Sequence, residues 1–202
     1  MTPRAKPPQT VHRRDVARAL LVHRGDLLLV TGGGSATWDC AAAGDHELTF
    51  PLWNAMGSAC SVGLGLALAQ PARRVLVATG DGDMLMGLGS IATIGSQRPE
   101  NLAIVVMDNE CYGETGMQAS HTAHGTDLAA IAAACGFART GVIRTGAEIR
   151  AMCAAIRSQR GPQFYQIKVV AETLPHAMPP RDGVWLKHRF RRALLGDSAL
   201  GP

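Results

Sequence analysis

The chain has 202 residues, of which 47% are hydrophobic and only 4% aromatic, so its composition predicts one domain with a core of small aliphatic side chains. Residues 1–14 and 181–202 carry nine Lys and Arg against two Asp, whereas the rest carries eleven against fourteen Asp and Glu. The net charge of +4 therefore belongs to the ends. The lack of a basic patch interleaved with aromatic residues argues against nucleic-acid binding.

Five cysteines form neither a CxxC pair nor a zinc-binding spacing, and their number is odd, which is typical of reduced thiols inside a cell. No apolar stretch approaches the length of a membrane span, and the basic N-terminus has no signal-type hydrophobic run. The sequence therefore predicts a cytoplasmic protein that does not bind membranes.

From the N-terminus, residues 1–12 contain three prolines and are expected to form a flexible arm. The spacing of apolar residues predicts a helix over Arg13–His23, and Leu27–Thr31 is typical of a buried strand. The glycines Gly32–Gly34 and then Ser35 follow that strand. Such a loop can wrap a phosphate with backbone N–H groups and a hydroxyl, although an ordinary loop has the same composition.

The stretch Leu52–Gln70 is rich in small residues and ends before Pro71, which predicts a helix packed closely against a sheet. Within it, Gly63 and Gly65 suggest part of a dinucleotide-binding fingerprint. That interpretation fails because a third glycine is missing, no strand precedes the segment, and the glycines lie inside a helix.

The most informative stretch is a predicted strand–helix–strand unit. Val75–Thr79 and Leu102–Met107 are short and apolar, as in parallel strands buried on both faces, and Met84–Ser96 has the length of a connecting helix. Gly80-Asp81-Gly82 follows the first strand, and Asp108-Asn109 follows the second. Ligands bind at the carboxyl ends of strands in open α/β sheets, so Asp81 and Asn109 are expected to lie together at a binding site.

These residue types suit a metal ion and a phosphate group. Asp81 offers a carboxylate oxygen, Asn109 an amide oxygen and Cys111 a backbone carbonyl oxygen, a set that suits Mg²⁺. The glycines that flank Asp81 let an anion approach the backbone closely, and the helix that opens near Asp83 directs free N–H groups at it. The alternative is an ordinary turn with solvated carboxylates.

After this unit the sequence predicts a loop over the same edge of the sheet. Its polar residues 114–122 are where substrate contacts and lids tend to lie. His121 is a candidate for proton transfer, with a solvated surface histidine as the alternative. Asp127 is expected to cap a helix over Asp127–Cys135. The elements expected after it are a strand over 137–143, a helix over Ala147–Gln159 and a strand over Gln163–Val170.

The order of these elements predicts a three-layer α/β/α domain with a mainly parallel sheet over residues 13–172. Residues 173–202 form a tail that begins with three prolines and becomes basic around residues 185–192. A segment of mixed apolar and basic residues either packs on a neighbour or is solvated.

Gly-Asp-Gly, 25 intervening residues and Asp108-Asn109 together resemble the fingerprint of thiamine diphosphate-dependent enzymes, which runs from GDG to a paired Asn. The family usually has Asn where this chain has Asp108, a departure that leaves Asn109 intact. From Asp15 to Val170 the chain resembles the diphosphate-binding (PP) domain of that family, which implies the thiamin diphosphate-binding fold. In that reading Asp81, Asn109 and the backbone carbonyl of Cys111 bind Mg²⁺.

The resemblance also implies which residues contact thiamine diphosphate. Ser35, Gly82 and Asp83 would contact the diphosphate. Met56 would prop the cofactor in its bent form, with simple core packing as the alternative, and the carbonyl of Asn54 would accept a hydrogen bond from the aminopyrimidine. The full implied set is Ser35, Asn54, Met56, Gly80, Gly82, Asp83, Met84, Asn109, Tyr112 and Gly113.

Three segments narrow the resemblance: NAMGSACSVGLGLALA, GDGDMLMGLGSIATIG and DNECYGETGMQ. They are similar to the small (beta) subunits of sulfopyruvate decarboxylases and to the matching part of phosphonopyruvate decarboxylases. The resemblance implies a lyase subunit that converts a small 2-oxo acid, sulfopyruvate or phosphonopyruvate, to CO₂ and an aldehyde. The alternatives are an acetolactate-synthase-like carboligase subunit and a non-catalytic thiamine diphosphate-binding subunit.

Decarboxylation in this family also needs a glutamate from a pyrimidine-binding domain, and no glutamate of this chain matches that role. In single-chain members that domain precedes this one, whereas a short arm precedes it here. The resemblance therefore implies a pyrimidine-binding (alpha-type) partner subunit that supplies the glutamate in a hetero-oligomer, with a homodimer as the alternative.

Overall fold

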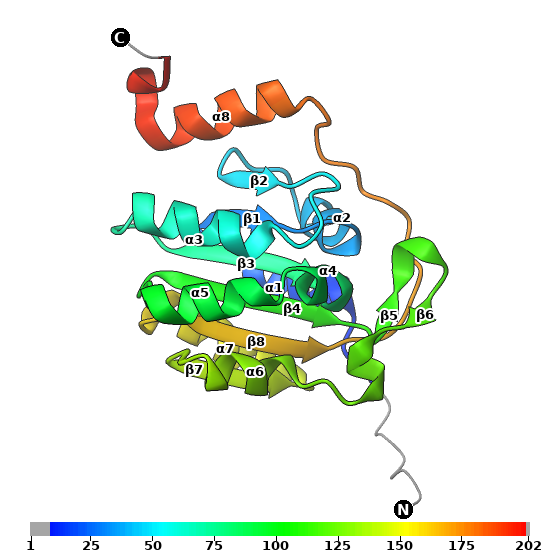
Figure 1. Cartoon of the computed structure of the whole chain (residues 1–202). Helices are drawn as coiled ribbons and strands as arrows, with labels where there is room; N and C mark the ends of the chain where they lie inside the picture. Colours follow the sequence, from blue (N-terminus) through cyan, green and yellow to red (C-terminus); the bar gives the residue numbers. More distant parts are fainter. Residues whose placement is uncertain (1–8, 201–202) are drawn as a thin grey trace, which may run out of the picture.

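The computed structural model describes residues 9–200, so residues 1–8 of the expected arm lie outside the described range. Six strands form one sheet in the order β2-β1-β3-β4-β8-β7 (Figure 1). In chain order they are β1 (Leu28–Thr31), β2 (Thr49–Pro51), β3 (Val75–Gly80), β4 (Leu102–Asp108), β7 (Arg139–Ile143) and β8 (Gln163–Lys168). Every pairing in this sheet is parallel, so the carboxyl ends of all six strands lie at one edge.

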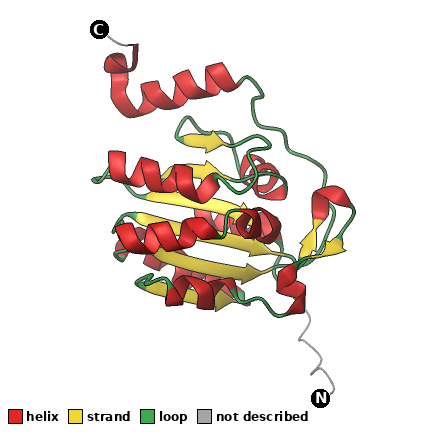
Figure 2. Cartoon of the chain, in the orientation of Figure 1, coloured by secondary structure: helices red, strands yellow, loops and turns green. Residues whose placement is uncertain are grey.

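Helices cover both faces of the sheet, and a hydrophobic core lies on each side (Figure 2). One face carries α1 (Arg13–Leu21), α2 (Ser35–Ala42) and α7 (Gly146–Ser158), and the other carries α3 (Ala59–Ala69), α4 (Asp81–Met86), α5 (Gly89–Gln97) and α6 (Leu128–Ala134). In β3, Leu76 faces the first core while Val75 and Val77 face the second, which explains why the strands are apolar throughout. The expected three-layer α/β/α fold class is confirmed.

The helix expected over Met84–Ser96 is instead two helices, α4 and α5, with a break at Gly87. At this break the chain lies close to the turn before α3. A Cβ added at Gly87 would lie 2.0 Å from the carbonyl oxygen of Gly57, so only glycine fits there. Glycine inside a helix is destabilising, which favours a break at this position.

The helix expected over Leu52–Gln70 begins only at Ala59, as α3. The residues ahead of it form turns, with φ of +51° at Asn54 and +79° at Gly57. The expected close packing against the sheet holds, because a Cβ added at Gly63 would lie 2.3 Å from a methyl group of Val77.

The polar segment after β4 is a small hairpin rather than an irregular loop. β5 (Cys111–Tyr112) and β6 (Gln118–Ala119) pair antiparallel around the 3-10 helix η1 (Gly113–Thr115), and η2 (His121–His124) follows. The hairpin projects beyond the carboxyl ends of the sheet strands (Figure 1). We call residues 110–122 the flap.

The C-terminal segment contains the helix α8 (Gly183–Leu195), which the sequence did not predict, followed by η3 (Gly196–Leu200). Asp182 caps α8 by accepting hydrogen bonds from two backbone N–H groups. Leu186 and Phe190 are buried, and Arg189 pairs with Asp45 at 2.5 Å, so α8 packs beside β2. No helix within residues 9–200 is long and apolar enough to cross a membrane.

Candidate cofactor-binding site

A cavity of about 370 Å³ lies at the carboxyl edge of the sheet, where β1, β3 and β4 end. Its volume falls within the roughly 300–1,000 Å³ of small-molecule sites. The loops after these strands, the turn before α3 and the flap form its walls. The lining residues are Gly33, Gly34, Ser35, Trp38, Asn54, Met56, Gly80, Asp81, Gly82, Asp83, Met86, Met107, Asn109, Cys111, Tyr112, Gly113, Glu114 and Thr115.

Every site residue predicted from the sequence lines this cavity except Met84 and His121. Met84 is buried behind it, where its sulfur lies 3.5 Å from that of Cys60. His121 contacts a lining residue, since its Nδ1 lies 3.0 Å from the hydroxyl oxygen of Tyr112. The structure therefore places His121 behind Tyr112, which lies between it and the cavity.

Two glycines give the cavity its shape because side chains pack directly over them. A Cβ added at Gly33 would lie 2.4 Å from the sulfur of Met56, and one added at Gly82 would lie 2.8 Å from the ring of Tyr112. Met56 is 41% exposed in this chain and lines the cavity, so its side chain lies outside the two hydrophobic cores. Larger residues at either glycine would displace the wall itself.

The side chain of Asp83 contacts the turn before α3, strand β3 and the loop after β1. Its Oδ1 accepts a hydrogen bond from the backbone N–H of Gly57 at 2.6 Å, and its Oδ2 accepts a hydrogen bond from the hydroxyl of Thr79. A Cβ at Gly32 would collide with the same carboxylate. The side chain of Asp83 therefore fixes the cavity walls, and its backbone remains the part available to a ligand.

Asp81 begins α4 and is 2% exposed. Its Oδ2 accepts a hydrogen bond from the hydroxyl of Ser120 at 2.5 Å, and the hydroxyl of Thr122 lies 3.2 Å from the same oxygen. Burial raises the pKa of Asp81 to about 6, the nearby Asp108 carboxylate adds to that rise, and the hydrogen bond from Ser120 opposes it. A carboxylate this costly to ionise is one that a bound cation would stabilise.

Asp108 ends β4 and is fully buried. Its Oδ2 accepts hydrogen bonds from Lys168 and Gln166, each at 2.5 Å, and its Oδ1 accepts one from Thr122 at 2.7 Å. These donors leave Asp108 committed to the protein, whereas Asp81 lines the cavity. Lys168 balances the negative charge of Asp108. Asp108 occupies the position where the family that the sequence resembles usually has Asn.

The sequence did not predict these partners. Lys168 has one signal, since it is a cation at the end of the otherwise uncharged strand β8. Ser120 and Thr122 have none, because hydroxyl residues are common in loops. Their importance comes from the way the flap folds back onto the ends of β3 and β4.

Lys168→Met is expected to lower the free energy of unfolding by about 3–5 kcal/mol, because it leaves a buried carboxylate without its cation. The double variant Lys168→Met/Asp108→Asn should recover much of that loss, since it removes both charges. Urea denaturation measured for the two variants checks this. Equal losses in the single and double variants would contradict the assigned pairing.

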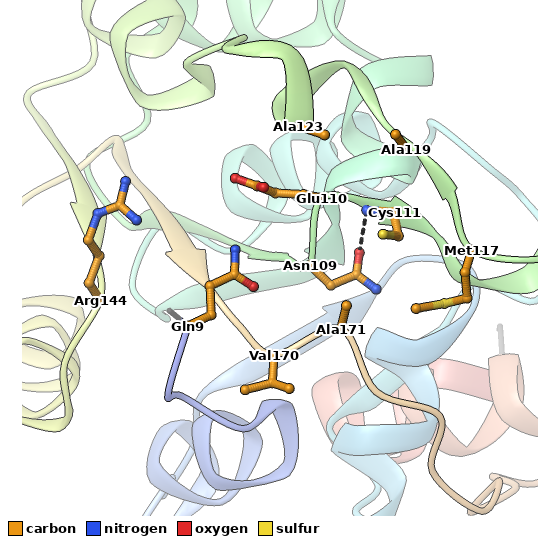
Figure 3. Close-up of a pocket in the computed structure, with 10 residues that line it drawn as sticks. All are labelled: Gln9, Asn109, Glu110, Cys111, Met117, Ala119, Ala123, Arg144, Val170 and Ala171. Carbon is orange, nitrogen blue, oxygen red and sulfur yellow. Dashed lines mark hydrogen bonds between the residues drawn. The ribbon is translucent and has the colours of Figure 1, made fainter. Parts of the chain in front are cut away.

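The turn after β4 carries two predicted metal ligands. Oδ1 of Asn109 accepts a hydrogen bond from the N–H of Cys111 at 3.0 Å, and Glu110 between them has φ of +62° (Figure 3). A second cavity of about 500 Å³ lies beside this turn and shares the same two residues. It is lined by Gln9, Asn109, Glu110, Cys111, Met117, Ala119, Ala123, Arg144, Val170 and Ala171.

The donor set suits a hard cation and a phosphate. Among residues 9–200, no three His, Cys, Asp or Glu side chains gather as a metal site. A site of one carboxylate, one amide and one backbone carbonyl needs no such cluster, and oxygen ligands are those that Mg²⁺ prefers. Asp81, Asn109 and Cys111 line the same cavity as the glycine loop, so the residues present fit both groups.

Comparisons with known proteins identify the family of the chain. Residues 33–167 match the family described as thiamine pyrophosphate enzyme, C-terminal TPP binding domain. The chain is 32% identical over 190 residues to sulfopyruvate decarboxylase subunit beta from Methanocaldococcus jannaschii, covering 90% of this chain and 96% of the relative. It is 43% identical over 112 residues to phosphonopyruvate decarboxylase from Streptomyces viridochromogenes, covering 55% of this chain and 28% of the relative.

Solved structures share the fold. Benzoylformate decarboxylase from Polynucleobacter necessarius gives a TM-score of 0.71 at 20% identity, covering 86% of this chain and 36% of that one. The thiamine diphosphate-dependent 4-hydroxybenzoylformate decarboxylase of Rhodococcus jostii gives 0.65 at 13%, covering 83% and 34%. This chain thus spans about a third of their length. The family match begins at Gly33 in the glycine loop and includes Asp81 and Asn109, and the chain belongs to the thiamine pyrophosphate enzymes through their C-terminal TPP-binding domain.

Proposed function

We propose that this chain is the diphosphate- and Mg²⁺-binding subunit of a two-subunit thiamine diphosphate-dependent decarboxylase that acts on sulfopyruvate or phosphonopyruvate. One observation carries the proposal: a glycine loop, the buried Asp81 and the turn Asn109–Cys111 line the same cavity. The names of the relatives support the substrate class, since they are decarboxylases of 2-oxo acids that carry a second acidic group.

In this proposal Mg²⁺ is held by Asp81, Asn109 and the backbone carbonyl of Cys111. The hydrogen bond from Cys111 to Oδ1 of Asn109 occupies one lone pair and leaves a second for the metal. Asp81 is costly to ionise because it is buried and lies near the Asp108 carboxylate. A bound cation would offset the negative charge of the ionised Asp81.

When bound, thiamine diphosphate supplies the electron sink for decarboxylation. The diphosphate would be held by the hydroxyl of Ser35 and the backbone of Gly80, Gly82 and Asp83. Met84 would contribute through its backbone alone, because its side chain is buried in the core.

The remaining wall residues would shape the bound cofactor. Met56 would support its bent form from the cavity side of Gly33, and the carbonyl of Asn54 would accept a hydrogen bond from the aminopyrimidine. Tyr112 and Gly113 would contact it from the flap. His121 would handle protons through its contact with the Tyr112 hydroxyl.

A pyrimidine-binding partner subunit would complete the site by supplying the catalytic glutamate. The designation "subunit beta" of the relatives supports such a partner. Met56 and Met86 line the cavity and are 41% and 66% exposed, which suits burial under a second chain. The expected assembly is a cytoplasmic hetero-oligomer.

Co-expression with a pyrimidine-domain subunit, followed by product analysis, tests the proposal. Sulfopyruvate or phosphonopyruvate should give CO₂ and an aldehyde in equal amounts. A product that joins two keto acids would favour the acetolactate-synthase-like carboligase instead. Cofactor binding without turnover, whichever partner is added, would favour a non-catalytic subunit.

Asn109→Asp is expected to weaken thiamine diphosphate binding on the order of tenfold, or about 1.4 kcal/mol. The change keeps an oxygen at the position but adds negative charge beside Asp81, Asp108 and the diphosphate. Titration calorimetry across a series of Mg²⁺ concentrations measures the effect. Unchanged affinity at every concentration would mean that Asn109 does not face the metal.

A further inference from the structure

Two hydroxyl groups of the flap reach the buried carboxylates at the ends of β3 and β4. Ser120 Oγ donates to Oδ2 of Asp81 at 2.5 Å. Thr122 Oγ1 lies 2.7 Å from Oδ1 of Asp108, 3.2 Å from Oδ2 of Asp81 and 2.9 Å from Ser120 Oγ. Ser120 and Thr122 are 0% and 2% exposed, whereas His121 between them is exposed. The two hydroxyls are thus inward contacts of a largely exposed segment.

We propose that Ser120 and Thr122 position the metal ligand Asp81 and couple the flap to it. This inference rests on the proposed function, because it assigns a role at the same site. Both side-chain hydroxyls that contact the Asp81 carboxylate, those of Ser120 and Thr122, lie against Oδ2. The carboxylate is therefore held from the flap side through Oδ2, and hydrogen-bond partners of this kind orient ligands in metal sites.

Each hydroxyl has one proton, so the contacts can be assigned. The 2.5 Å contact assigns the Ser120 proton to Asp81, and the 2.7 Å contact assigns the Thr122 proton to Asp108. Two neighbouring carboxylates, one for the metal and one for the protein, are held by one short segment. The segment keeps their separation fixed despite their mutual repulsion.

The sheet anchors this arrangement. Asp108 is fixed by Lys168 and Gln166 of β8, and both donors are buried. Thr122 is thereby attached to a rigid strand end, while the Ser120 N–H also donates to the carbonyl of Glu110 at 2.9 Å. These contacts leave little freedom for the base of the flap.

The coupling follows from what else the flap carries. Four residues of the flap line the cavity: Tyr112, Gly113, Glu114 and Thr115. Ser120 belongs to the same flap and directly follows its second strand, β6. Cys111 belongs to it as well, next to Asn109 (Figure 3). A metal that fixes Asp81 therefore also fixes, through Ser120, the segment that closes over the cavity.

Mn²⁺ binding, measured by electron paramagnetic resonance at saturating thiamine diphosphate, tests the positioning role. Ser120→Ala and Thr122→Val should each weaken Mn²⁺ binding by about tenfold, and the double variant by up to about 100-fold. Thr122→Ser keeps the hydroxyl and should bind as the parent does. Tyr165→Phe is the matched control, since Tyr165 is also buried but its hydroxyl donates to the side chain of Gln163, and neither residue lines the cavity. It should lose stability without losing Mn²⁺ affinity.

Hydrogen exchange of the backbone amides of the flap, residues 110–122, tests the coupling. Adding Mn²⁺ and thiamine diphosphate should slow exchange there in the parent and much less in Ser120→Ala/Thr122→Val. Parent-like Mn²⁺ affinity in the variants would overturn the positioning role and leave the proposed function intact. A parent that binds neither ligand would overturn both. If Thr122→Val does not fold, Ser120→Ala and Thr122→Ser decide the question.

Discussion

Asp81→Ala is expected to abolish the joint binding of Mg²⁺ and thiamine diphosphate. The substitution removes the only carboxylate among the proposed ligands, and without the cation the diphosphate lacks a balancing positive charge in a cavity that Glu114 also lines. Loss of one partner of a buried charged pair costs about 2–5 kcal/mol, which is roughly 30- to 5,000-fold in Kd. Titration calorimetry with each ligand, alone and together, measures it.

The matched control is Asp127→Ala. Asp127 caps α6 by accepting a hydrogen bond from the N–H of Ala130 at 2.9 Å, and it does not line the cavity. Its removal should lower stability by about 1 kcal/mol and leave cofactor affinity unchanged. If Asp81→Ala held Mg²⁺ and cofactor as tightly as this control, the metal assignment would be wrong.

Replacing Asp81 by the neutral, similarly shaped Asn should raise the stability of the metal-free protein. The folded-state pKa of about 6 lies above the ordinary range of an aspartate, so the ionised group destabilises the metal-free protein above about pH 6. Asp81→Asn should therefore be more stable than the metal-free parent at neutral pH. That advantage should shrink as the pH falls through 6 toward 4, because the parent then takes up the proton. Urea denaturation in a chelator at several pH values measures both, and a pH-independent difference would contradict the assignment.

Local patterns made much of the sheet predictable. The apolar runs around Val77 and Ile104 are buried on both faces, so their composition alone identifies parallel strands. The polar residues Asp81 and Asn109 directly follow such runs, and the parallel arrangement then brings them to one edge. Asp127 was predicted as a cap because N-capping depends only on its own helix.

Other boundaries depend on contacts between distant parts of the chain. The turn at Gly57 lies against the break at Gly87 and leaves room only for glycine there, and nothing local to residues 84–96 encodes that approach. The late start of α3 has the same origin, as Gly57 donates its N–H to Asp83. Segment length and composition correctly indicate helix in both places but do not place the helix boundaries.

The site divides in the same way. Residue types alone indicated a metal and a phosphate at Asp81 and Asn109, and the family resemblance identified the cofactor. The side chains that hold Asp81 and Asp108 in place were not predictable, because Ser120 and Lys168 reach the ends of β3 and β4 only in the folded chain. Supporting contacts of this kind carry almost no sequence signal.

The isolated chain, saturated with Mg²⁺ and thiamine diphosphate, is expected to release CO₂ from sulfopyruvate or phosphonopyruvate at least about 100-fold more slowly than its complex with a pyrimidine-domain subunit. Positioned acid–base groups contribute roughly 10²–10⁴-fold, and the proposed partner supplies the glutamate that activates the cofactor. Within this chain, Glu114 lines the cavity, but its carboxylate accepts a hydrogen bond from Trp38 on the same wall.

The experiment compares CO₂ release by the purified chain, by the partner subunit and by their mixture, with mass spectrometry excluding a co-purified partner. Cofactor binding is measured on the same samples, so that an inactive chain is distinguished from an empty one. A chain that binds cofactor and is activated by the partner supports a site shared between two subunits. Turnover by the chain alone, equal to that of the mixture, would mean that one of its own groups activates the cofactor. Glu114→Gln would then be the variant to examine, because Glu114 is the glutamate placed on the cavity wall.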